Sequence, residues 1–458
     1  MLRYALAEPV LSTVEGVRAT PACAEASAGR QHDTAGRIEG RFAIMTAMKG
    51  QDLYKKAKAL IPGGTQLLTK RPEYYLPEGW PSYYAKAKGV EVTDLDGKTY
   101  TDMTRNGVGA CILGAGDPDV DAAVKSAIDA GSMSTLNCPE EVELAELLCE
   151  LHPWAQRVRF ARTGGEAMAV AVRIARAATG KDVVACCGYH GWHDWYLAAN
   201  LVSRDALTGH LRANLEPAGV PQALRGTIFP FRYNAIEELN AIVEREGDRI
   251  GAIVMEPIRD HAPTDEFLKK VRAIADRIGA VLIFDEISAG FRLATGGAHL
   301  TLGTEPDIAV FAKAMGNGYP MAAIIGRASA MAGAEKTFIS STYWSERTGP
   351  VAAIATIRKH RKHKVHEHLN RIGTLVQEGW KGAAKSAGLS ITVGGIPPLS
   401  HFGIADDVSK EAQRAFTRAM LTKGFLADTA FYPTFAHNES HVTRYLKAVE
   451  EVFSELNP

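Results

Sequence analysis

Short apolar runs alternate with helical patterns through the middle of the chain. Each run holds four or five apolar residues and is bounded by glycine, proline or charged residues, which is typical of a buried strand. Strands separated by helices form βαβ units, and these build a mostly parallel sheet with right-handed crossovers. The pattern therefore predicts an α/β fold with strands at 183–187, 252–255, 281–284 and 308–311.

Two helices of this core show an apolar face. Residues 164–180 carry apolar side chains at helical spacing, and so does the segment between the strands at 252–255 and 281–284. We expect Thr264 or Asp265 to cap the second helix and Gly279 to end it.

Both flanks of this core predict a smaller α+β domain. Residues 89–102 contain Asp96-Gly97 and are typical of a β-hairpin. After residue 350, helical patterns surround a predicted strand at 391–395, and a last helix starts near Ser440. We therefore assign residues 105–349 to a large domain, and residues 45–104 and 350–458 to a smaller one.

Residues 1–44 lack this periodicity. They are rich in Ala, Gly, Thr and Arg, and residues 38–41 read IEGR, which a protease used to remove fusion tags recognises. Two interpretations stay open: a leader that comes from a tag or a mis-assigned start, and a natural disordered extension. We exclude the segment from the fold and take Met45 or Met48 as the natural start.

Charge and cysteine content exclude several classes of function. Lys+Arg and Asp+Glu are both 52 among the 458 residues, so net charge does not favour nucleic acid or an anionic membrane. The apolar runs are far shorter than the ~20 residues of a membrane helix. The six cysteines are dispersed without a C-x-x-C pair, so we predict no metal site and no disulfide framework, in a reducing cytoplasm.

Candidate chemistry follows the predicted strands. Open α/β sheets bind ligands beyond the carboxyl ends of their strands, and here these ends are followed by Tyr189, Glu256, Asp285 and Lys313. Lys313 lies in an apolar stretch, and an ammonium is costly to bury unless it is paired or its pKa falls. Such a lysine is suited to shuttle a proton or to form an imine.

A candidate anion site opens the helix at 164–180. Thr163-Gly164-Gly165-Glu166 places small residues at the helix N-terminus, where free N–H groups and the helix dipole attract a phosphate. The pair of glycines is a weak signal by itself.

Taken in order, these segments resemble the class III aminotransferases. The matching stretches are TGGEA at 163–167, GYHGWHD at 188–194, EP at 256–257, IFDEISAGFR at 283–292 and FAKAMGNGYP at 311–320. The likeness covers about residues 50–455. It is closest to the branch that contains glutamate-1-semialdehyde aminomutase, which IPGG at 61–64 also resembles.

The resemblance implies a pyridoxal 5′-phosphate (PLP)-dependent transferase fold of type I. Lys313 would then hold PLP as an imine and serve as general base and acid. Asp285 would keep the pyridine nitrogen protonated, so that the ring accepts electrons from a carbanion. Tyr189 would stack on one face of the ring and Ile287 would press on the other.

The resemblance also implies how the rest of PLP is bound. Gly164 and Gly165 would give backbone N–H groups to its phosphate, and Glu256 would join the hydrogen-bond network around the ring. Thr342 aligns with a threonine that reaches the phosphate in the partner subunit, which implies a homodimer with shared active sites. The stretch 342–350 is three residues longer than the family pattern, so Thr348 is a rival for that role.

The predicted activity is transfer of an amino group from a donor, expected to be glutamate, to an aldehyde or ketone. Aromatic rings and carboxylates in the expected pocket segments suit an oxidised amino sugar, as in aminoglycoside biosynthesis. Candidate anchors for the donor's carboxylate are Arg71 and Arg259. The expected pocket residues are Trp80, Tyr83, Tyr84, Trp192, Trp195, Tyr196, Tyr343, Trp344, Asp194 and Glu346.

Two alternatives remain. One is an aminomutase of the glutamate-1-semialdehyde type, although the altered stretch at 342–350 departs from that enzyme. Many family members carry a glutamate where this chain has His261. The other is a PLP-binding regulator without catalysis, which the intact Lys313 and Asp285 argue against.

Overall fold

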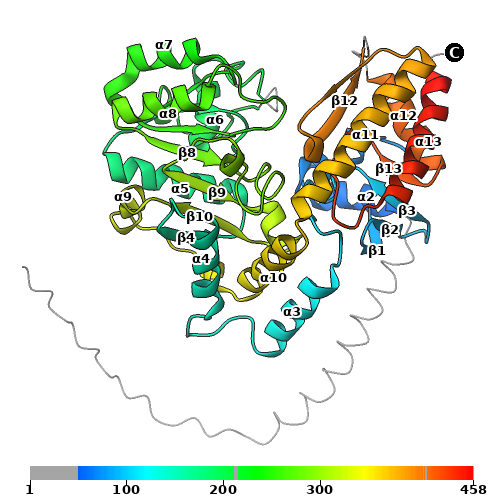
Figure 1. The fold of residues 1–458 in the computed structure, drawn as a ribbon, viewed down its shortest axis with the longest axis horizontal. Coiled ribbons are helices and arrows are strands. Elements are labelled where there is room, and N and C mark those ends of the chain that lie inside the picture. The colour runs from blue at the N-terminus through cyan, green and yellow to red at the C-terminus, as the bar shows by residue number, and fades with distance from the viewer. Residues whose placement is uncertain (1–49, 211–214, 406, 408–409, 457–458) are drawn as a thin grey trace, which may run out of the picture.

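The structure is a computed structural model that describes residues 50–210, 215–405, 407 and 410–456 (Figure 1). The predictions for residues 1–44, including the leader, and those for Met45 and Met48 lie outside the described residues.

A seven-stranded sheet forms the larger half of the molecule. Its strand order is β4-β10-β9-β8-β7-β5-β6. Strand β10 is antiparallel to both of its neighbours, β4 and β9, and the other four neighbouring pairs are parallel. The four strands expected from the sequence are β5, β7, β8 and β9, so the prediction of a mostly parallel α/β core is confirmed. The bounds are β4 (Arg157–Ala161), β5 (Val183–Cys187), β6 (Ile228–Pro230), β7 (Ile250–Met255), β8 (Val281–Asp285), β9 (Ile308–Phe311) and β10 (Ala322–Gly326).

Helices cover both faces of this sheet (Figure 1). Cys186 belongs to the core cluster with α5 (Gly164–Thr179), whereas Cys187 belongs to the cluster with α7 (Ile236–Glu246) and α8 (Phe267–Ile278), because neighbouring strand residues point to opposite faces. A third cluster joins the sheet to α3 (Pro118–Asp129), α4 (Glu140–Leu151) and α10 (Thr348–Lys362).

The start of α8 differs from the expectation. The residue that caps the helix is Glu266, in a left-handed conformation with φ 56°, and not Thr264 or Asp265. Asp265 is left-handed as well, with φ 49°, so the chain turns into the helix one residue later than expected. The expected end is confirmed, since Gly279 adopts φ 65°.

The first and last segments of the described residues meet in a second body. Strand β13 (Phe425–Ala427) pairs in parallel with β3 (Thr99–Met103), which forms the expected hairpin with β2 (Glu91–Asp94) through Asp96-Gly97. Further elements of this body are β1 (Tyr84–Lys88), β11 (Ile391–Gly394), β12 (Ser400–Ile404), β14 (Ala430–Phe431), α2 (Gly50–Leu60), α11 (Val365–Ala387), α12 (Glu411–Thr422) and α13 (Glu439–Leu456).

Figure 1 shows this body beside the large sheet, with α10 running between them. Helix α10 begins at Thr348 and packs against α3, so an assigned domain boundary at 349/350 falls inside its first turn. The domain boundaries stay predictions. Within the described ranges, no helix combines the length and apolarity needed to cross a membrane.

Candidate active site

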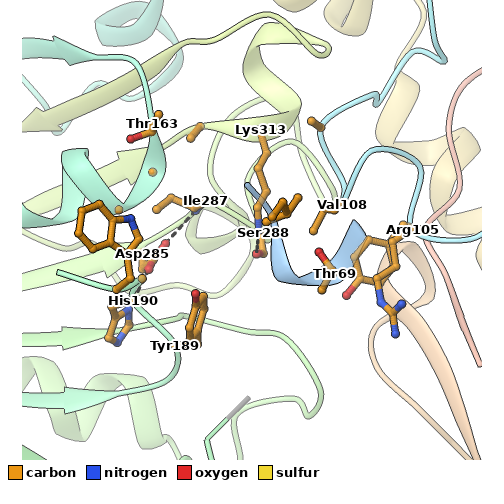
Figure 2. Close-up of a pocket in the computed structure, with 18 of the residues that line it drawn as sticks. Thr69, Arg105, Val108, Thr163, Tyr189, His190, Asp285, Ile287, Ser288 and Lys313 are labelled. Atoms are coloured by element: carbon orange, nitrogen blue, oxygen red, sulfur yellow. Dashed lines mark hydrogen bonds and ion pairs between the residues drawn. The ribbon is translucent and has the colours of Figure 1, made fainter. Parts of the chain in front are cut away.

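Lys313 lies two residues beyond β9, at the wall of a cavity of about 590 Å³ that we call the reaction cavity. Its backbone is left-handed, with φ 48°, and begins a short 3₁₀ turn over Lys313–Gly316. The side chain is partly buried, and Nζ donates a hydrogen bond to Ser288 Oγ at 2.7 Å. Figure 2 shows the lysine reaching toward Ser288, with Asp285, His190 and Tyr189 to one side.

The surroundings of Lys313 favour its uncharged amine. The pKa of Lys313 is lowered from 10.5 to about 8, with burial as the largest cause. The positive charges of Arg259 and Arg292 contribute to this lowering, while Asp285 and Glu256 oppose it. A substantial fraction of the amine is therefore unprotonated at mildly alkaline pH and can act as a base.

Asp285 is the last residue of β8 and is held from two sides. Its Oδ1 accepts a hydrogen bond from the backbone N–H of Ile287 at 3.0 Å, and its Oδ2 accepts one from His190 Nδ1 at 2.8 Å. Both side chains are buried, and His190 Nε2 has no hydrogen-bond partner among the described residues. His190 thus braces Asp285.

Glu256 links the ends of β5 and β7. Its Oε1 accepts a hydrogen bond from Arg259 Nη1 at 2.6 Å, and its Oε2 accepts one from the backbone N–H of Tyr189 at 3.3 Å. Arg259 Nη2 also donates to Ser288 Oγ at 3.3 Å. Because Ser288 bonds Lys313, one polar network joins the residues that follow β5, β7, β8 and β9.

The N-terminus of α5 faces the same cavity. Thr163, Gly164 and Gly165 line it, and the first N–H groups of an α-helix have no partner within the helix. A Cβ on Gly164 would lie 2.8 Å from Ile287 Cδ1, so glycine is what lets Ile287 pack against this turn. The arrangement offers a donor-rich concavity to an anion.

The aromatic residues expected in the pocket are mostly elsewhere, which corrects the sequence interpretation. Only Trp192 of that set lines the reaction cavity among the described residues; Trp195 and Tyr196 are buried in the core beside α5, and Tyr343 is 68% exposed. Trp344 packs against the same core. Trp80, Tyr83 and Tyr84 line a second cavity, and the rings found in the reaction cavity besides Trp192 are Tyr74, Tyr189, Tyr319 and Tyr432.

The stretch that precedes α10 lies outside the cavity lining. Thr342 is exposed at the start of a 3₁₀ turn, Thr342–Ser345, so its expected contact with a partner's phosphate stays a prediction. Glu346, expected in the pocket, instead accepts from Arg162 Nε at 3.0 Å and from the backbone N–H of Thr348 at 2.7 Å. Asp194 also lies outside the lining.

Of the two candidate carboxylate anchors, Arg259 lines the cavity and Arg71 does not. Sequence reasoning missed Ser288 and Arg292. Ser288 follows β8 by three residues, so its place beyond a strand end was a signal that could have found it. Arg292 is 1% exposed and donates to the carbonyl of Gly109 at 2.6 Å, which no pattern along the chain indicates.

Comparison with known proteins gives a consistent assignment. The family model described as aminotransferase class-III matches residues 77–451. The chain is 32% identical to the glutamate-1-semialdehyde 2,1-aminomutase of Dechloromonas aromatica, over 89% of this chain and 99% of that one. It is 30% identical to the 3-aminobutyryl-CoA aminotransferase of Cloacimonas acidaminovorans, with 89% and 97% covered.

A third relative is the 2′-deamino-2′-hydroxyneamine transaminase of Streptomyces kanamyceticus, 29% identical with 81% of this chain and 92% of that one covered. Among solved structures, the FumI protein of Sphingopyxis sp. MTA144 in its PLP internal aldimine form superimposes with a TM-score of 0.81. It is 26% identical and covers 89% of this chain and 96% of its own. The expected PLP-dependent transferase fold of type I is confirmed.

Proposed function

This chain belongs to the class III aminotransferases, and from that membership we propose that it moves an amino group from glutamate to the carbonyl of an oxidised amino sugar. Enzymes of this class depend on PLP. When bound, PLP supplies the electron sink that stabilises negative charge on the donor's α-carbon. The observation that carries the proposal is the amine of Lys313, whose pKa is lowered to about 8 and which donates a hydrogen bond to Ser288.

The described residues fit PLP. We propose that the N-terminus of α5 binds the phosphate through the backbone N–H groups of Gly164 and Gly165, which line the reaction cavity. Asp285 is the last residue of β8 and would face the pyridine nitrogen. Ile287 and Tyr189 would enclose the ring. A buried acid, an amine and a helix N-terminus match three polar groups of this cofactor, namely its pyridine nitrogen, its aldehyde and its phosphate.

Lys313 is proposed to move the proton. Its uncharged Nζ would take a proton from the donor's α-carbon and return it on the cofactor side, because the tether holds the amine over the reacting atoms. Ser288 Oγ, at 2.7 Å, would keep the amine oriented between these two positions. Glu256, through Arg259, would hold Ser288 in turn.

The donor and acceptor are proposed from the cavity. Arg259 lines it and is the candidate anchor for the carboxylate of glutamate. The cavity of about 590 Å³ has to hold PLP together with the donor or the acceptor. The Streptomyces kanamyceticus relative, a transaminase of a neamine derivative, supports an oxidised amino sugar as the acceptor, and aminoglycoside biosynthesis as its setting.

An internal amino exchange is the second candidate. The Dechloromonas aromatica aminomutase aligns over 99% of its length. A glutamate-1-semialdehyde-type activity is therefore tested together with the proposed aminotransferase activity. A regulator without catalysis is disfavoured, because Lys313, Asp285 and the glycine turn of α5 all converge on one cavity.

We further propose that the enzyme works as a cytoplasmic homodimer. Leu136, Val142 and Trp192 are 80%, 63% and 70% exposed, and large apolar side chains of this kind are commonly covered by a partner. Thr342 would reach the phosphate bound by the partner subunit. Sedimentation at micromolar concentration tests this assembly.

The visible absorption spectrum of the PLP-loaded protein tests the proposed activity. Glutamate, a small amino aldehyde and an aminoglycoside are added separately. We expect glutamate and the aminoglycoside each to convert the PLP spectrum to that of pyridoxamine phosphate, because the reverse reaction starts from the product amine. A response to the amino aldehyde alone would establish the aminomutase instead.

The matched variant is Lys313→Ala. We expect it to bind PLP without the lysine-dependent absorption band and to lose turnover while keeping its fold by circular dichroism. Wild-type turnover in this variant would overturn the proposed mechanism.

A further inference from the structure

A second cavity, which we call the side cavity, adjoins the reaction cavity. It has a volume of about 530 Å³ and lies between α2, the hairpin of β2 and β3, and the segment that connects them. Thr69, Arg105 and Val108 line both cavities. Figure 2 shows these three on the side of Lys313 that faces away from Asp285. These three residues therefore form the boundary at which the two cavities adjoin.

Thr69 leaves a hydrogen-bonding group unused at this junction. The residue is 5% exposed, and its Oγ1 has no hydrogen-bond partner among the described residues. A buried hydroxyl without a partner is unfavourable, and most such groups in proteins are satisfied. Because Thr69 lines both cavities, a polar ligand group placed there would supply the partner.

Asp102 supplies a carboxylate to the side cavity. Its Oδ1 accepts hydrogen bonds from the N–H and the hydroxyl of Thr104, at 2.9 and 2.6 Å, and it forms no ion pair within the described part of the chain. Burial raises the pKa of Asp102, and the negative charge of Asp428 raises it further. A bound cation would relieve both effects.

The cations that line the side cavity do not neutralise Asp102. Arg105 Nη1 pairs with Asp428 Oδ2 at 2.5 Å, and Lys70 is exposed to solvent. The acid is therefore left for a ligand.

Aromatic rings form much of the remaining wall. Trp80 stacks on Tyr75 with ring centroids 4.3 Å apart and an interplanar angle of 9°, which fixes both rings. Tyr83 and Tyr100 line the same cavity. Aromatic faces pack against the C–H faces of sugar rings and attract cations. An acid, a free hydroxyl and rigid rings together suit a ring that bears hydroxyl and ammonium groups.

We propose that the side cavity binds the second ring of a two-ring aminoglycoside whose other ring presents its reacting carbon to Lys313. An ammonium group of the second ring would pair with Asp102, a hydroxyl would bond Thr69 Oγ1, and the ring would pack against Trp80 and Tyr83. This inference rests on the proposed function and names the part of the chain that selects the acceptor.

The test measures binding and reaction separately in the PLP-loaded enzyme. Calorimetry gives the dissociation constants of neamine, which has two rings, and of glucosamine, which has one. The rate of spectral conversion by glutamate is measured in the same samples. In the wild type, we expect neamine to bind at least about tenfold more tightly than glucosamine, since the second ring adds a charge pair and a stacked face.

Two variants probe the side cavity, with one matched control. Asp102→Asn keeps an acceptor for Thr104 but removes the charge, and Thr69→Val removes the free hydroxyl at constant shape. Each is expected to weaken neamine binding by about fivefold or more, and to change glucosamine binding less than neamine binding in the same variant. The control is Asp96→Asn, an exposed acid in the hairpin turn, where Asn-Gly is equally favourable.

The outcomes separate this inference from the proposed function. If glutamate converts the spectrum but neamine and glucosamine bind alike, or neither variant affects neamine, the side cavity does not bind a second ring. If glutamate and the amines leave the spectrum unchanged, the proposed function fails, while neamine binding that depends on Asp102 still supports the side cavity. A melting temperature within a few degrees of the wild type confirms that each variant is folded.

Discussion

His190 and Asp285 are joined by a hydrogen bond of 2.8 Å between Nδ1 and Oδ2, and both side chains are buried. Among the described residues, the acid accepts one further hydrogen bond, from the backbone N–H of Ile287. The imidazole therefore provides the side-chain donor that fixes the carboxylate beyond β8, where it would face the pyridine nitrogen of PLP.

Replacing His190 with leucine is expected to lower kcat about 10- to 100-fold, because a hydrogen bond to a charged group contributes about 1.5–3 kcal/mol. Steady-state kinetics with glutamate measures the loss. His190→Gln keeps a donor and should recover part of the activity, and exposed His363→Gln should leave kcat unchanged. A wild-type kcat in His190→Leu would show that Asp285 needs no brace.

Lys313 should make stability depend on pH in the cofactor-free protein. Its pKa falls from 10.5 to about 8 on folding, so the unfolded chain binds more protons between these values and stability rises as pH increases from about 8 to 10.5. At pH 7 the lysine is charged in both states, and its burial costs at most about 3 kcal/mol.

Lys313→Met removes this cost. We expect the variant to melt at a higher temperature than the wild type at pH 7, and the difference to shrink as pH rises through 8 toward 10.5. Differential scanning calorimetry across this range measures both effects. A difference that stays constant with pH would mean that the amine keeps its ordinary pKa.

Gly164 is expected to tolerate no side chain. A Cβ there would lie 2.8 Å from Ile287 Cδ1, so Gly164→Ala should destabilise the protein by about 1–3 kcal/mol through overpacking and should weaken PLP binding. Urea unfolding and PLP titration measure the two effects.

Gly382→Ala is the matched control for that substitution. Gly382 lies in α11, and a Cβ added there would meet no atom within 4 Å, so alanine should stabilise the helix by about 0.5–1 kcal/mol. If Gly164→Ala binds PLP as the wild type does, the concavity at α5 is not the phosphate site.

The residues that converge on the reaction cavity could be predicted because they follow strands. Tyr189, Asp285 and Lys313 line the cavity, and Glu256 accepts a hydrogen bond from the backbone of Tyr189. Each of the four comes one or two residues after an apolar run, and parallel strands bring such positions to one edge. Here a local pattern and a general rule of topology were sufficient. Ser288 follows the same rule at a longer spacing, so the turn after β8 had to be seen before its hydroxyl could be placed.

The lining of the cavity could not be predicted in this way. Trp195 and Tyr196 follow Trp192 closely, but the short helix α6 (Asp194–Leu197) directs them into the core, while Trp192 lines the cavity. Which ring faces the cavity depends on how that single turn packs against α5, and not on the local sequence. Glu346 likewise pairs with Arg162 instead of lining the cavity, and this contact between distant parts of the chain is not visible in the local sequence.

The pair of Arg162 and Glu346 should be one of the strongest ion pairs in the molecule. Arg162 directly precedes the glycine turn of α5, its side chain is 9% exposed and that of Glu346 is 16% exposed. Glu346 also accepts hydrogen bonds from the N–H groups of Thr348 and Gly349, so it caps α10. One carboxylate thus ties the start of α10 to the wall of the reaction cavity.

Glu346→Ala removes both functions at once, and we expect a loss of about 3 kcal/mol in unfolding free energy, because a partly buried guanidinium loses its partner and a helix loses its cap. The control is Glu335→Ala, whose pair with Arg157 has side chains 71% and 47% exposed and should contribute under about 1 kcal/mol. Raising the salt concentration should weaken the control pair and leave the Arg162 pair nearly unchanged, since buried charges are screened less. Equal losses in the two variants would mean that burial does not strengthen the Arg162 pair, and that the stretch before α10 is held by other contacts.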